Sequence, residues 1–95
     1  MIWRKYRTVV LGDLARRIID EKTRNIPRFD KAWRALEWKL ARQAHKMIKH
    51  SIADVDIYHV YRQPGDQIAG TPNITILFTI AEDEVVVHAA RVTSL

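Results

Sequence analysis

Apolar residues recur every three or four positions between residues 29 and 47, and this is the clearest pattern in the chain. The spacing places these residues on one stripe of an α-helix, where they can pack together on a core. Trp38 lies outside the stripe, so its side chain is expected at the surface. The pattern predicts one long amphipathic helix, whose buried stripe is Phe29, Trp33, Leu36, Leu40, Ala44 and Met47.

A shorter helical pattern precedes it and predicts a first helix from about residue 11 to near Arg24. Asn25-Ile26-Pro27 follows. Because proline cannot donate a hydrogen bond inside a helix but suits its first turn, we expect one helix to end and the next to begin there. Residues 2–10 mix aromatic, β-branched and basic side chains, which predicts a short edge strand. The apolar stripe expected for the first helix is Val10, Leu14 and Ile18, with Leu11, Ala15 and Ile19 beside it.

After Ser51 the apolar period changes to two, which is typical of strands. Residues 54–61 predict one strand, in which Asp54 and Asp56 only edge the strand. Residues 74–80 and 85–92 predict a hairpin across a short acidic turn, after a loop rich in glycine and proline. We therefore expect an α+β domain spanning residues 1–95, in which an N-terminal strand and a helical hairpin pack on an antiparallel C-terminal β-meander.

Composition narrows the function classes. The 95 residues include no cysteine, which excludes disulfides, thiolate metal sites and a cysteine nucleophile. The N-terminal residues lack the apolar run of a signal peptide, and no stretch has the roughly 18–20 apolar residues of a membrane span. A cytoplasmic protein without a membrane partner is expected.

Positive charge is concentrated in the first half of the chain. Residues 1–50 hold 14 Lys and Arg against 5 Asp and Glu, a net +9, whereas residues 51–95 hold 2 against 6, a net −4. Clustered cations favour a nucleic acid or an acidic protein partner, and a merely solvated helix surface is the alternative. The candidate nucleic-acid-binding residues are Lys39, Arg42, Lys46 and Lys49 on the second helix.

The last two expected strands read TILFTIAEDEVVVHAARV over residues 75–92: an apolar strand, a short acidic turn, a valine-rich strand and an arginine. This run, together with the order of elements, resembles the RelE/ParE superfamily of toxins from bacterial toxin-antitoxin systems. The resemblance implies a RelE/ParE-like domain that acts on translation by cleaving messenger RNA on the ribosome, or on DNA gyrase. It also implies a partner antitoxin, whose acidic segment neutralises the toxin, while a homodimer is left open.

The catalytic residues of the RNA-cleaving branch carry over only in part. Arg91 matches the arginine that follows the valine-rich strand. The family's later aromatic and histidine positions fall at Val92, Thr93 and Ser94, which cannot transfer that proton, and an arginine of the penultimate strand falls near Thr75. The gyrase-directed branch needs no such set. A non-catalytic basic module that binds an acidic protein or nucleic acid is therefore the alternative function.

Histidine is the usual proton carrier near neutral pH, so His59 and His88 are the candidate general bases. Strand alternation predicts His88 on the open face of the sheet, with His59 or Tyr61. Arg62 and Arg91 would stabilise the phosphate charge, and Lys46 and Lys49 would position the nucleic-acid backbone. Hydrogen-bonded structural histidines are the alternative. No cofactor is expected, and no metal, since His45 and His50 lie five residues apart on a helix and make a poor ligand pair.

Overall fold

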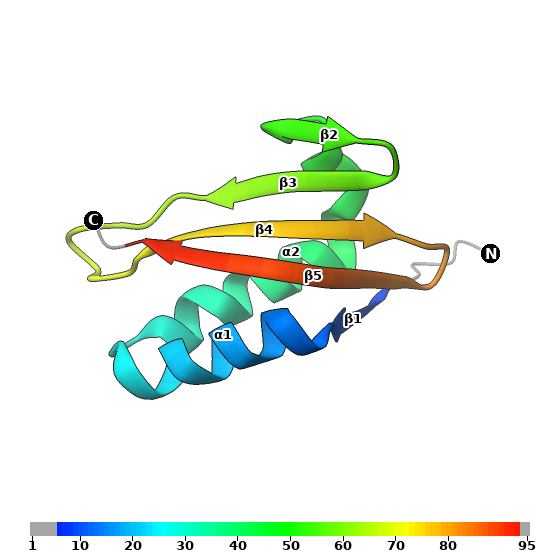
Figure 1. The fold of residues 1–95 in the computed structure, drawn as a ribbon. Coiled ribbons are helices and arrows are strands. Elements are labelled where there is room, and N and C mark those ends of the chain that lie inside the picture. Colours follow the sequence, from blue (N-terminus) through cyan, green and yellow to red (C-terminus); the bar gives the residue numbers. More distant parts are fainter. Residues whose placement is uncertain (1–5, 94–95) are drawn as a thin grey trace.

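The structure, a computed structural model, describes residues 6–93 as a five-stranded sheet with two helices on one face (Figure 1). The predicted α+β class is confirmed. The elements in chain order are β1 (Thr8–Leu11), α1 (Asp13–Asn25), α2 (Phe29–Ile48), β2 (Ala53–Val55), β3 (Tyr58–Gln63), β4 (Asn73–Ile80) and β5 (Glu84–Thr93).

The strands lie in the order β1-β5-β4-β3-β2. From β2 to β5 each strand is antiparallel to the next, as a meander requires, whereas β1 pairs parallel with β5. β1 and β2 are therefore the two edge strands. The sheet is mixed, and residues 2–5 of the predicted N-terminal strand lie outside the described residues.

The core lies between α2 and the middle of the sheet. Each residue of the predicted α2 stripe is buried, from Phe29 to Met47, so that prediction is confirmed. The stripe packs on alternate residues of the two central strands, because successive side chains of a strand point to opposite faces. The sheet contributes Ile74, Ile76, Phe78, Val85 and Val87 to this core.

The stripe expected for the first helix is partly wrong. Val10 belongs to β1, and Leu14 is 59% exposed, whereas Ala15 and Ile19 are buried. The reason is that the chain stays paired to the sheet as far as Gly12, whose N–H donates to the Val87 carbonyl at 2.9 Å. The helix cannot begin before Asp13, and its orientation on the sheet follows from that start.

The single strand expected over residues 54–61 is also wrong. β2 and β3 form a tight hairpin, joined through Asp56 and Ile57. Asp56 has a φ of 54°, a left-handed conformation that such two-residue turns require and that aspartate tolerates. The C-terminal half thus has four strands rather than three.

α2 bends at Gln43, whose φ of −131° is not helical. Near the bend the Ala41 carbonyl accepts a hydrogen bond of 2.8 Å from the Arg7 backbone N–H. A donor inserted into the helical hydrogen-bond ladder is a recognised cause of a kink. The contact ties the start of β1 to the middle of α2. Within residues 6–93, neither helix has the length and apolar character needed to span a membrane.

Candidate functional site

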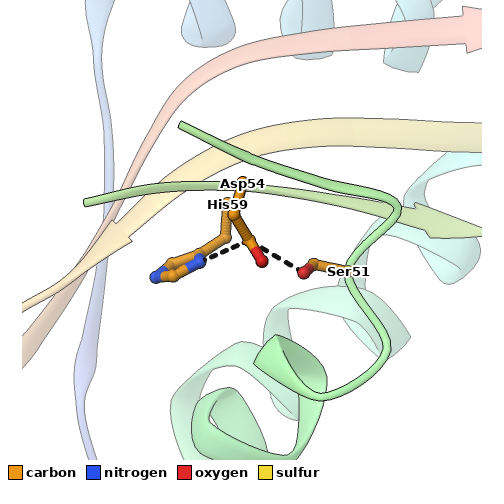
Figure 2. Close-up of polar contacts among 3 residues, drawn as sticks. All are labelled: Ser51, Asp54 and His59. Carbon is orange, nitrogen blue, oxygen red and sulfur yellow. Dashed lines mark hydrogen bonds and ion pairs between the residues drawn. The ribbon is translucent and has the colours of Figure 1, made fainter. Parts of the chain in front are cut away.

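Ser51, Asp54 and His59 meet where the C-terminal end of α2 approaches the β2–β3 hairpin (Figure 2). Asp54 lies directly opposite His59 in the hairpin register. His59 Nδ1 is 2.8 Å from Asp54 Oδ1, and the Ser51 hydroxyl donates to the same oxygen at 2.8 Å. A carboxylate can only accept, so Nδ1 carries the ring proton and Nε2 is left able to accept one.

The electrostatics of the cluster favour a charged carboxylate. The hydrogen bond from His59, followed by the one from Ser51, lowers the pKa of Asp54 below its ordinary value of 3.8. The Asp54 side chain is 51% exposed, so solvent screens this interaction, whereas the His59 side chain is only 17% exposed. The His59 ring also lies against Phe78, with ring centres 5.6 Å apart. Core packing and a carboxylate together fix the ring.

A cleft of about 200 Å³ lies between α2 and β3, on the same side of the sheet as His59. His59, Tyr61 and Gln63 pair with the buried residues of β4, so all three point toward the helices. The Lys39 ammonium donates to the Gln63 side-chain oxygen at 3.0 Å. The cleft is cationic, because its lining holds two lysines and no acidic residue. The lining consists of Lys39, Gln43, Lys46, Met47, His50 and Tyr61.

Arg62 and Arg91 lie on the opposite, uncovered face of the sheet. Each pairs with Thr75 in the strand register, so the three residues form one row across β3, β4 and β5. A shallow hollow of about 180 Å³ beside this row is lined by Thr75, Leu77 and Arg91, among others. The structure brings these two predicted arginines together, and separates them from His59 by the thickness of the sheet.

His88 also lies on the uncovered face. It is the extra residue of a bulge, because Leu77 pairs with Ala89 while Phe78 pairs with Val87. Its Nε2 is 2.9 Å from the Thr79 hydroxyl, and its ring meets the Tyr58 ring edge to face at 5.3 Å. The expected grouping of His88 with His59 or Tyr61 is not found, because the turn at Asp56 sends those two side chains to the helix face.

The predicted basic set on α2 is divided as well. Lys39 and Lys46 line the cleft, whereas Lys49 is exposed at the end of the helix. Arg42 lies on the other flank of α2, with its guanidinium carbon 4.3 Å from the centre of the Tyr6 ring and 4.8 Å from that of Trp38. It lines a separate hollow between α2 and β1.

Sequence reasoning missed the part that Asp54 and Ser51 play. One signal was available. Asp54 and His59 lie five residues apart with Asp56, a residue type that favours turns, between them. A two-residue turn at 56–57 places the two side chains opposite each other. As for metal binding, no three His, Asp or Glu side chains in the described part of the chain gather as ligands would.

Comparison with known proteins gives no match: no family model, no curated protein and no solved structure matches this chain.

Proposed function

We propose that this chain binds RNA through the cleft between α2 and β3, as a toxin-type domain resembling the RelE/ParE proteins. The observation that supports this most is a cationic cleft with a carboxylate-held histidine close by. Lys39 and Lys46 come from α2, and His59 comes from the facing strand. Phosphate groups are attracted to such lysines regardless of base sequence.

His59 supplies the acid-base chemistry in this proposal. Its Nε2 takes the proton of an RNA 2′-hydroxyl, whose oxygen bonds to phosphorus while the bond to the 5′-oxygen breaks and that oxygen takes a proton from water. Asp54 keeps the proton on Nδ1 and stabilises the charged imidazolium that forms, as the carboxylate of a catalytic triad does. The products are a 2′,3′-cyclic phosphate and a 5′-hydroxyl end. Arg62, Arg91 and His88 take no part, since they lie on the other face.

The binding step is tested by the salt dependence of affinity for a single-stranded RNA. Each phosphate contact contributes about −0.7 to the slope of log K against log salt. The double variant Lys39→Gln and Lys46→Gln should therefore bind more weakly, with a slope shallower by about 1.4. Fluorescence anisotropy at several salt concentrations measures both quantities.

The matched control removes two positive charges elsewhere, with Arg16→Gln and Arg17→Gln on exposed positions of α1. This control should keep the slope of the original chain. Equal losses in both double variants would mean that RNA responds only to net charge, and the cleft would lose its assignment.

A non-catalytic binding module is the second candidate, and one observation favours it. His59 lies on one face of the sheet, whereas the other predicted catalytic residues, His88, Arg62 and Arg91, lie on the opposite face, so the predicted set does not form one site. RNA that is bound but acquires no cyclic phosphate ends would support this module over the nuclease. Neutralisation by an antitoxin and action on DNA gyrase stay expectations from the resemblance.

A further inference from the structure

The face of the sheet turned away from the helices is apolar over its centre, and within residues 6–93 no other element covers it (Figure 1). An antiparallel sheet that faces water normally carries polar residues on that side. Here Val55 and Tyr58 lie opposite each other on the open face and are 67% and 39% exposed. The neighbouring row across β2, β3, β4 and β5 is apolar throughout and consists of Ala53, Val60, Leu77 and Ala89. Such a continuous apolar surface is typical of an interface.

Charge divides the open face into a basic end and an acidic end. Arg62 and Arg91 lie in one row, near the C-terminal ends of β3 and β5. Glu84 begins β5 and points to the open face, because its neighbour Val85 is buried on the helix side. The β2–β3 turn, which contains Asp56, lies at the same end of the sheet as Glu84 (Figure 1). Within the described residues none of these four charged side chains pairs with an opposite charge.

We propose that two copies of the chain associate through their open faces, with the strands of one sheet running opposite to those of the other. A two-fold axis across the strands then places Arg91 of each copy over Glu84 of the other. Arg62 approaches Asp56 in the same way, since β3 lies over β3. Between the charged ends the apolar rows of both copies meet, at the spacing of about 10 Å that packed sheets keep.

The centre of the open face suits packing against a second sheet. A hollow of about 180 Å³ is lined by Val60, Leu77 and Ala89, among others, and gives room for side chains of the second copy to interdigitate. The polar side chains near the centre satisfy each other, because His88 Nε2 is 2.9 Å from the Thr79 hydroxyl. A hydrogen-bonded pair can be buried without leaving an unsatisfied group.

Charge also selects the occupant of the open face. A nucleic acid or a uniformly acidic protein would neutralise Arg62 and Arg91, but Glu84 and Asp56 at the other end would repel it. A second copy presents the same two ends in reverse, so each charged end meets its opposite. The helix face stays free in this dimer, and the cleft between α2 and β3 remains accessible. The inference therefore does not rest on the proposed function.

Sedimentation equilibrium of the purified chain tests the association, and we expect a dimer at about 0.1 mM. Val55→Lys places a charge in the apolar centre and should give a monomer at that concentration. Ile68→Lys is the matched control and should remain dimeric, because Ile68 lies in the loop between β3 and β4 and is 96% exposed. A monomeric original chain, or a dimer that survives Val55→Lys, would overturn the proposal.

Charge reversal tests the orientation of the two copies. Arg91→Glu and Glu84→Arg each turn two attractive contacts into repulsive ones, so either variant alone should dimerise about tenfold more weakly. An equimolar mixture of the two variants restores opposite charges at both contacts and should form a mixed dimer with the affinity of the original chain. Unchanged dimerisation of each variant, as pairing of sheet edges predicts, or weakening without rescue in the mixture would contradict this arrangement. The Lys39→Gln, Lys46→Gln variant should dimerise normally, which keeps failure here distinct from failure of the RNA cleft.

Discussion

At the scale of single residues, two local irregularities decide which side chains can act together. The turn at Asp56 directs His59 and Tyr61 to the helix face, while the bulge at His88 brings Ala89 and Arg91 to the open face. Strand alternation alone cannot foresee either, because one residue more or less inverts every side chain beyond it. The exposure of Trp38 was predictable, since helical spacing continues without interruption through its position.

The Asp54 contact predicts a specific pH dependence. Because the folded state lowers the pKa of Asp54, its contribution to stability is fully present above the unfolded value of 3.8 and is lost as pH falls through the lowered pKa. Asp54→Asn keeps an acceptor for His59 but does not titrate. Urea unfolding should show the original chain more stable than Asp54→Asn at pH 7, with the difference shrinking in acid.

Ser51→Ala is the companion variant, because it removes the second cause of the lowered pKa and leaves the first. Its acid sensitivity should fall between those of the other two chains. A stability difference between the original chain and Asp54→Asn that stays constant from neutral to acid pH would contradict the assigned contact.

At the scale of elements, the long helix α2 was more predictable than the β2–β3 hairpin. The stripe of α2 could be read in full, because its period of three or four persists over the whole helix. The division of residues 53–63 into β2 and β3 could not, because Val55 and Ile57 continue the apolar alternation across the turn. The hairpin brings Asp54 and His59 together, so the candidate site could not be predicted without predicting the hairpin.

The loop from β3 to β4 depends on a glycine for space. A Cβ at Gly65 would overlap the Thr71 carbonyl oxygen and the backbone of Pro72, and the Gly65 N–H donates to the buried Asn73 side chain at 2.8 Å. Gly65→Ala should therefore cost about 1–3 kcal/mol of stability, as overpacked sites do. Gly70→Asn is the control, since nothing lies near its Cβ and asparagine tolerates its positive φ of 74°. Thermal unfolding of both variants measures the difference, and equal melting temperatures would refute it.

At the scale of the whole molecule, α2 separates two basic surfaces that a single count of charge cannot distinguish. Lys39 and Lys46 face β3, whereas Arg34 and Arg42 face β1. The charge asymmetry predicted a basic helix. Which flank of α2 faces which strand depends on long-range strand pairing, above all that of β1 with β5. Local periodicity carries no information about such pairing.

The central claim is that RNA occupies the cleft between α2 and β3, and mapping by NMR tests it most directly. A short single-stranded RNA is titrated into the isotope-labelled chain, and shifted resonances are assigned to residues. The account predicts the largest shifts at Lys46, His59 and Tyr61. Shifts confined to Arg62, Thr75 and Arg91 on the open face would contradict it and move the nucleic-acid site to the other side of the sheet.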